Sequence, residues 1–87
     1  MNISRNEQRA LHVLALGGQI LHLRSDGPKI TSATCVTREG MALADFDLTV
    51  FNRLRWKRLI ESRSGSPYRI SKRGLTSIHV QLDNRGV

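Results

Sequence analysis

Cysteine and aromatic residues are scarce in this chain of 87 residues. It contains one cysteine, Cys35, and only 5% of its residues are aromatic. A single cysteine excludes an internal disulfide, so no covalent bond crosslinks the core. Because aromatic residues are few, Val, Leu and Ile must supply most of the core packing. Apolar residues make up 39% of the chain, too many for a disordered protein. The length predicts one domain over residues 1–87.

Long apolar segments and a secretion signal are also lacking. The longest apolar-leaning stretch, residues 11–23, is interrupted by a glycine pair and contains two histidines and a glutamine. It is too short and too polar to cross a bilayer. With a lone cysteine and no signal peptide, we expect a soluble protein of the reducing cytoplasm that has no membrane partner.

The sequence shows no grouping of residues that is typical of an active site or a metal site. His12, His22 and His79 fall on three different predicted elements without metal-ligand spacing. The phosphate-binding motif G-x-x-x-x-G-K is absent, and Cys35 lies in a predicted strand, where a buried hydrophobe is the expected role. We therefore predict that the protein is not an enzyme and has no catalytic residues, metal, cofactor or small-molecule substrate.

Acidic residues are scarce only in the second half of the chain. Residues 1–47 carry five basic and five acidic side chains, whereas residues 48–87 carry nine basic and two acidic ones. The net charge of +7 therefore belongs to the C-terminal half. Such a one-sided basic field attracts a polyanion or an acidic protein surface, although basicity also serves solubility alone.

Capping and turn residues predict a helix and a hairpin in the first half. Ser4 and Glu7 form a capping box that begins a helix, and the glycines at 17–18 end it. Residues 19–24 and 29–37 are apolar or β-branched and flank turn residues, which predicts a hairpin. The connection that follows, residues 41–45, fits either a short third strand or an irregular segment.

The second half repeats this order. Asp47 is an N-cap residue in front of an amphipathic helix. A Gly-Ser turn separates two strand candidates, and Ser71 caps a last helix. The predicted bounds are 48–58 for the first helix, 59–63 and 67–70 for the strands, 72–82 for the last helix and 83–87 for a frayed tail.

The order helix–hairpin–helix–hairpin–helix indicates an α+β, winged-helix-like single domain. In winged-helix proteins the helix before the last hairpin enters the DNA major groove, and that hairpin, the wing, follows the phosphates. Winged helices also serve as protein-binding modules, so the pattern is more specific for fold than for function.

Basic side chains concentrate on this helix and wing, and they predict one outward patch that binds a macromolecule. Arg55 and Arg58 could instead cover the core with their aliphatic stems. Trp56 is either exposed beside Arg53, as an interface hot spot or a base-stacking platform, or it closes the base of the wing as core. The candidate partner-binding or nucleic-acid-binding residues are Asn52, Arg53, Arg55, Trp56, Lys57, Arg58, Arg63, Arg69, Lys72 and Arg73.

Motifs along the whole chain resemble those of the YjhX family of small bacterial toxins. They include N-I-S-R at residues 2–5, L-H-V-L-A at 11–15, R-E-G at 38–40, P-Y-R-I at 67–70 and Q-L-D-N-R at 81–85. The resemblance implies a toxin of a toxin–antitoxin pair. It implies a protein that binds bacterial DNA topoisomerase I and blocks the relaxation of negatively supercoiled DNA, with an acetyltransferase-like antitoxin as its second partner.

Two other functions compete with this hypothesis. The first is a winged-helix DNA-binding transcriptional regulator, for which DNA itself would be the partner. The second is a small ribonuclease-like toxin that would depend on one of the three histidines. The resemblance favours direct contact with a protein, and it implies no catalytic residues.

Overall fold

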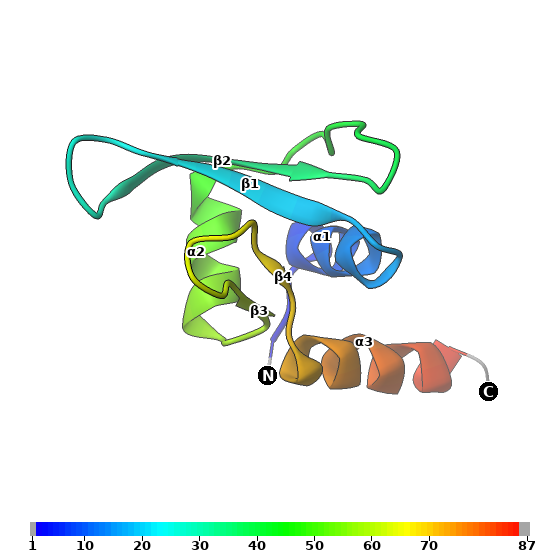
Figure 1. The fold of residues 1–87 in the computed structure, drawn as a ribbon. Coiled ribbons are helices and arrows are strands. Elements are labelled where there is room, and N and C mark those ends of the chain that lie inside the picture. Colours follow the sequence, from blue (N-terminus) through cyan, green and yellow to red (C-terminus); the bar gives the residue numbers. More distant parts are fainter. Residues whose placement is uncertain (1, 86–87) are drawn as a thin grey trace.

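Three helices and two small antiparallel hairpins make up the described part of the chain. The computed structural model describes the backbone of residues 2–85 and the side chains of residues 2–78. This confirms the predicted α+β class. In chain order the elements are α1 (Arg5–Ala15), β1 (Gln19–Arg24), β2 (Ile30–Val36), α2 (Leu48–Trp56), β3 (Ile60–Glu61), β4 (Arg69–Ile70) and α3 (Lys72–Arg85) (Figure 1).

The two ends of α1 have the caps that the sequence predicts. The Ser4 hydroxyl accepts a hydrogen bond from the Glu7 amide at 3.2 Å, which satisfies one free amide of the first turn. Gly17 adopts a φ of +104°, and the amide of Gly18 donates to the Val13 carbonyl at 3.0 Å. Because this left-handed turn suits glycine, the chain leaves α1 here and enters β1.

The hairpin of β1 and β2 lies across one side of α1 and α2 (Figure 1). It is antiparallel, and its register pairs Gln19 with Val36. The ambiguous connection after it is a short pairing, because Ala42 forms a β-bridge with Val36. The amide and carbonyl of Ile20 both bond to Tyr68 at 2.9 Å, so β1 also joins the second hairpin.

The second hairpin is much shorter than the sequence predicts. Its strands have two residues each, with Ile60 opposite Ile70 and Glu61 opposite Arg69. Within the predicted strands over 59–63 and 67–70, only Ile60–Glu61 and Arg69–Ile70 pair with each other, and Tyr68 pairs with Ile20 instead. Ser64 and Gly65 both adopt positive φ angles, of +54° and +77°, which ends the ladder early.

α2 ends at Trp56, before the predicted residue 58. Arg58 adopts a φ of +58°, the left-handed conformation that more often belongs to glycine. Its amide donates to the Arg55 carbonyl at 3.0 Å, and the Leu59 amide donates to the Leu54 carbonyl at 3.0 Å. This cap reverses the chain and directs Leu59 into the core, where its side chain is fully buried.

α3 begins directly against the end of α2. The Ser71 hydroxyl accepts from the Gly74 amide at 3.0 Å and donates to the Arg58 carbonyl at 2.7 Å. α3 is longer than predicted and continues to Arg85, so residues 83–85, which were predicted to belong to a frayed tail, lie within the helix. No glycine or proline interrupts residues 75–85 to stop the helix. Residues 86–87 lie outside the described residues.

One apolar cluster connects both halves of the chain. Its largest fully buried side chains, Leu11, Ile20, Phe51, Leu54 and Leu59, come from α1, β1, α2 and the turn after α2. Since these elements share one core, the exposed face of α2 is held in a fixed position relative to the start of α1.

Candidate macromolecular interface

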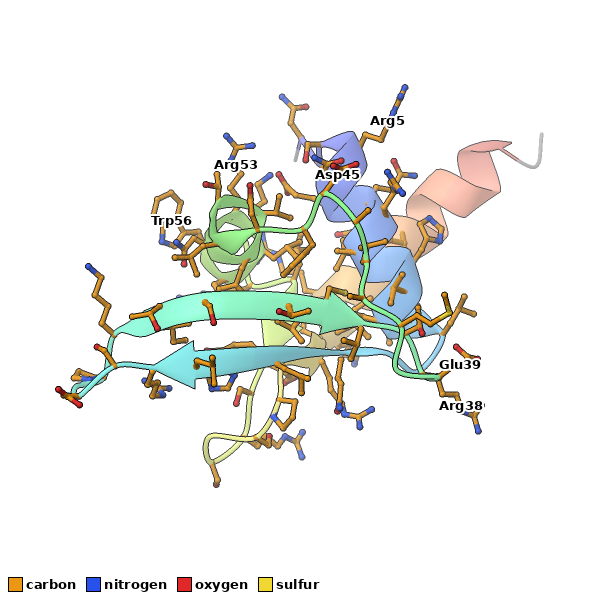
Figure 2. The ribbon with its side chains drawn as sticks, turned by 90° about the horizontal axis from the view of Figure 1, so that it is seen from above. Arg5, Arg38, Glu39, Asp45, Arg53 and Trp56 are labelled. Atoms are coloured by element: carbon orange, nitrogen blue, oxygen red, sulfur yellow. The ribbon has the colours of Figure 1, made fainter. Side chains whose placement is uncertain are left out.

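The outward face of α2 carries an exposed tryptophan beside an arginine. Val50, Phe51 and Leu54 are buried and fix the inward face of this helix. On the other side, 83% of Trp56 is exposed and Arg53 is also exposed. Figure 2 shows both side chains projecting outward from α2. The structure thus decides between the two roles predicted for Trp56, since the indole is not part of the core.

Lys57, one of the predicted partner-binding residues, is engaged by two contacts inside the molecule. Its Nζ donates to Glu7 Oε2 at 2.6 Å and to the Asn2 carbonyl at 2.7 Å. The Glu7 side chain is only 1% exposed, and its Oε1 accepts from the Ser4 hydroxyl at 3.1 Å. A buried carboxylate needs a paired cation, so Lys57 neutralises Glu7 and holds the N-terminal segment against α2.

A depression of about 570 Å³, which we call the Trp56 groove, lies between α2 and this N-terminal segment. Ile3 and Trp56 form its apolar walls. Because Lys57 neutralises Glu7, the charge that remains for a partner is that of Arg53. The groove is lined by Asn2, Ile3, Ser4, Glu7, Arg53, Trp56 and Lys57.

Arg55 covers the aromatic part of the core at the other flank of α2. Its guanidinium carbon lies 5.4 Å from the centroid of the Phe51 ring and 5.9 Å from that of Tyr68. The two rings meet edge to face at 5.0 Å. Cation–π contacts of this length stabilise the fold, so the structure supports the alternative role considered for Arg55.

The second hairpin carries a second, separate group of basic residues. Arg63 and Arg69 are exposed and line a hollow of about 300 Å³ together with Glu61, whose carboxylate lowers its net charge. The guanidinium Nη2 of Arg69 also donates to Gln19 Oε1 at 3.4 Å. The two hollows share no lining residue, so the predicted binding residues fall into two groups.

The remaining candidates lie at the edges of these groups. Asn52 is half-buried on α2, one turn before Trp56. Arg58 is exposed, but its backbone forms the cap of α2. Lys72 and Arg73 are exposed in the first turn of α3. The structure therefore brings Arg53, Trp56 and Lys57 together in one groove and places the other basic candidates outside it.

The sequence did not reveal the N-terminal wall of the groove. Glu7 was interpreted only as a capping residue, and Asn2 and Ile3 only as part of the N-I-S-R motif. No local pattern links Glu7 to Lys57, because the two are far apart in sequence and meet only after α1 and α2 have packed together.

Among the described residues, the environment of the thiol and the positions of the potential metal ligands do not suit catalysis or metal binding. Cys35 is fully buried, and this burial raises the pKa of its thiol from 9.0 to about 11, which favours an unreactive thiol at neutral pH. No three potential metal ligands come together among residues whose side chains are described. Within the described residues, no helix has the length and apolar character needed to cross a membrane.

Similar proteins occur in several bacteria. A "UPF0386 protein" of Cereibacter sphaeroides is 76% identical over 86 residues, which cover 99% of each chain. One of Rhodospirillum rubrum is 65% identical over 86 residues, covering 99% of this chain and 96% of the relative. One of Caulobacter vibrioides is 53% identical over 85 residues, covering 98% of this chain and 93% of the relative. No solved structure matches the chain.

A family model establishes what these relatives share with this chain. The model of the YjhX toxin family matches residues 1–85 and is described as "Putative toxin of bacterial toxin-antitoxin pair". The match covers nearly the whole chain and confirms the resemblance found in the sequence motifs. A toxin of such a pair has an antitoxin as a partner. The chain therefore belongs to the YjhX toxin family.

Proposed function

We propose that this protein is a non-enzymatic toxin that binds bacterial DNA topoisomerase I and blocks the relaxation of supercoiled DNA. The observation that carries this proposal is the pair of Trp56 and Arg53 on the rim of a preformed groove. Tryptophan and arginine are the residue types most enriched among interface hot spots. The exposed indole leaves a large apolar surface in water, and burying it on another protein is favourable.

The positions of the nucleophilic and basic side chains support a binding role over catalysis. Cys35 is buried in β2, away from solvent. His22 packs edge to face on Tyr68 at 5.2 Å, whereas His12 lies on α1. A ribonuclease-like toxin would need an accessible general base beside a second catalytic group. The described side chains of these two histidines lie on separate elements and do not supply that pair.

The proposed inhibition follows from steric occupation. The toxin docks its α2 face on an acidic surface of topoisomerase I, and the charge of the C-terminal half raises the rate of encounter. A protein of this size bound beside the DNA channel obstructs strand passage without altering the catalytic residues of the enzyme. An acetyltransferase-like antitoxin, the second partner in this proposal, relieves the block by binding the toxin.

A winged-helix DNA-binding regulator is the alternative. The wing group favours it, since Arg63 and Arg69 flank a hollow beside β4, while Lys72 and Arg73 begin the next helix. In a winged helix these positions contact phosphates. However, the strands of this wing are only two residues long, and Glu61 lies in the same hollow. We therefore keep the topoisomerase inhibitor as the main proposal.

A binding and relaxation experiment tests the main proposal. The wild-type protein should retain purified topoisomerase I in a pull-down and should inhibit the relaxation of supercoiled plasmid. Trp56→Ala and Arg53→Glu should remain folded by circular dichroism and weaken binding at least about tenfold, as expected for hot-spot residues. Arg38→Glu is the matched control, because Arg38 is exposed and lies far from Trp56 in Figure 2.

A gel shift with DNA alone separates the alternative. A DNA-binding regulator that makes six or more phosphate contacts loses about 10³-fold in affinity between 50 and 200 mM salt. Tight, salt-dependent DNA binding together with normal topoisomerase activity in the presence of the protein would favour the regulator. Equal retention of topoisomerase I by the folded Trp56→Ala variant and the wild type would contradict the role given to α2.

A further inference from the structure

We propose that the Trp56 groove binds an acidic amphipathic segment of a protein partner. In this complex an apolar side chain of the segment lies between Ile3 and Trp56, and neighbouring carboxylates of the segment pair with Arg53. The inference rests on the proposed function and adds the chemistry of the segment that the partner must present.

The apolar part of the inference comes from the groove walls. Trp56 is 83% exposed, although its helix packs tightly on the core through Phe51 and Leu54. Ile3, the other apolar lining residue, is itself half-buried against the core and therefore held in place. Between the two walls there is space for an aliphatic or aromatic side chain. Inserting such a side chain buries apolar surface of Ile3 and Trp56. The loss of conformational entropy is small, because the groove is already formed.

The acidic part follows from the charges around the groove. Its single carboxylate, Glu7, is buried and neutralised by Lys57 at 2.6 Å. Arg53 and Arg5 project toward the same side in Figure 2, and both are exposed. Asp45, which lies between them in that view, is paired with Arg9 at 3.8 Å. The rim is therefore left with positive charge, which favours carboxylates on the partner.

A protein segment fits these walls better than a nucleic acid. A stacked base requires flat surfaces, whereas Ile3, the other apolar lining residue of the groove, has a branched aliphatic side chain. Each nucleotide also brings a phosphate that needs a cation. The one ammonium group among the lining residues, that of Lys57, is already used by Glu7 and the Asn2 carbonyl.

The single tryptophan of the chain provides a direct probe of this groove. Protein labelled with 5-fluorotryptophan gives one fluorine resonance, which belongs to Trp56. We expect the chemical shift of this resonance to change on addition of one equivalent of purified topoisomerase I, beyond the broadening that any large complex causes. A photo-crosslinking p-benzoylphenylalanine in place of Trp56 should capture a segment that contains acidic and apolar residues. The same crosslinker at Leu16, which is 78% exposed at the end of α1, should not capture it.

A charge exchange completes the test. Arg53→Glu should weaken the complex at least about tenfold, and replacing an acidic residue of the captured segment by lysine should restore most of the loss, as paired charges do. A complex that leaves the fluorine resonance unchanged, or a captured segment that is neutral or basic, would overturn the inference while the proposed function stands. A shift caused by a 20-base-pair duplex alone at 150 mM salt would assign the groove to nucleic acid. Absence of any complex in sedimentation would refute both proposals.

Discussion

Lys57 at the end of α2 donates to the buried carboxylate of Glu7 in the first turn of α1, with Nζ 2.6 Å from Oε2. This contact joins two helices that are distant in the sequence. The same Lys57 Nζ also donates to the Asn2 carbonyl at 2.7 Å. It therefore contributes both to the stability of the fold and to the shape of the Trp56 groove.

The first prediction concerns this ion pair. Lys57→Met should lower the free energy of unfolding by about 2–3 kcal/mol, because it leaves the Glu7 carboxylate buried without a counter-charge. Since 27% of the Lys57 side chain is exposed, we expect less than the full cost of a completely buried pair. Urea unfolding followed by circular dichroism measures the change.

A double variant is the control for the ion pair. Glu7→Gln combined with Lys57→Met removes both charges and should recover most of the lost stability. If Lys57→Met alone changes the free energy of unfolding by less than about 0.5 kcal/mol, the carboxylate is not held as the structure indicates.

The second prediction concerns the left-handed residue that ends α2. Arg58→Gly should raise the free energy of unfolding by about 0.5–1 kcal/mol, because glycine adopts the φ of +58° without steric cost. Arg53→Gly makes the same chemical change inside the helix and should lower it by about 1 kcal/mol. Thermal unfolding of both variants distinguishes the positions, and a loss of stability in Arg58→Gly would refute the cap.

The third prediction concerns the contact between the start of α3 and the turn after α2. A Cβ at Gly74 would lie 2.3 Å from the Leu59 carbonyl oxygen, so Gly74→Ala should destabilise the protein by at least about 2 kcal/mol. This reverses the usual gain from replacing glycine by alanine in a helix. Gly27→Ala is the control, because its Cβ meets nothing within 4 Å and should change stability by less than about 0.5 kcal/mol. Equal unfolding midpoints for the two variants would contradict the packing.

The fourth prediction is a pH dependence that comes from Cys35. Burial raises the pKa of this thiol from 9.0 to about 11 in the folded protein, so the unfolded chain loses its proton first as the pH rises. The contribution of Cys35 is therefore constant below pH 9 and decreases stability between pH 9 and 11, by up to about 1.4 kcal/mol per pH unit.

Replacement of the thiol isolates this effect from other groups that titrate in the same range. Cys35→Ala removes the ionisable group, and its free energy of unfolding should decrease less steeply above pH 9 than that of the wild type. Urea unfolding at pH 8, 9, 10 and 11 gives the two slopes. Parallel curves for both proteins would show that the thiol ionises as freely in the folded state as in the unfolded state.

Local sequence signals predicted the features that depend on a few adjacent residues. Ser4, Asp47 and Ser71 each cap a helix in the structure, as the pattern indicated. The buried positions of Phe51 and Leu54 followed from helical spacing. The α+β class could be read from these signals together, since each marks the beginning or inner face of an element.

Features that depend on tertiary contacts could not be read in this way. Arg58 ends α2 in a conformation that its residue type disfavours, and Leu59 compensates by entering the core. Lys57 was assigned to the binding surface with its neighbours because charge alone does not show which cation lies beside a buried acid. Arg55 was likewise a binding candidate until the positions of Phe51 and Tyr68 were known.

The pairing of Ile20 with Tyr68 has a consequence for the order of events during synthesis. The amide and carbonyl of Ile20 find their partners only when Tyr68 is available, and Ile78 of α3 completes the same core. A nascent chain that has emerged only as far as α2 therefore lacks both partners and has not assembled this core. Nearly the whole polypeptide must therefore be synthesised before the Trp56 groove, which rests on this core, can be in place.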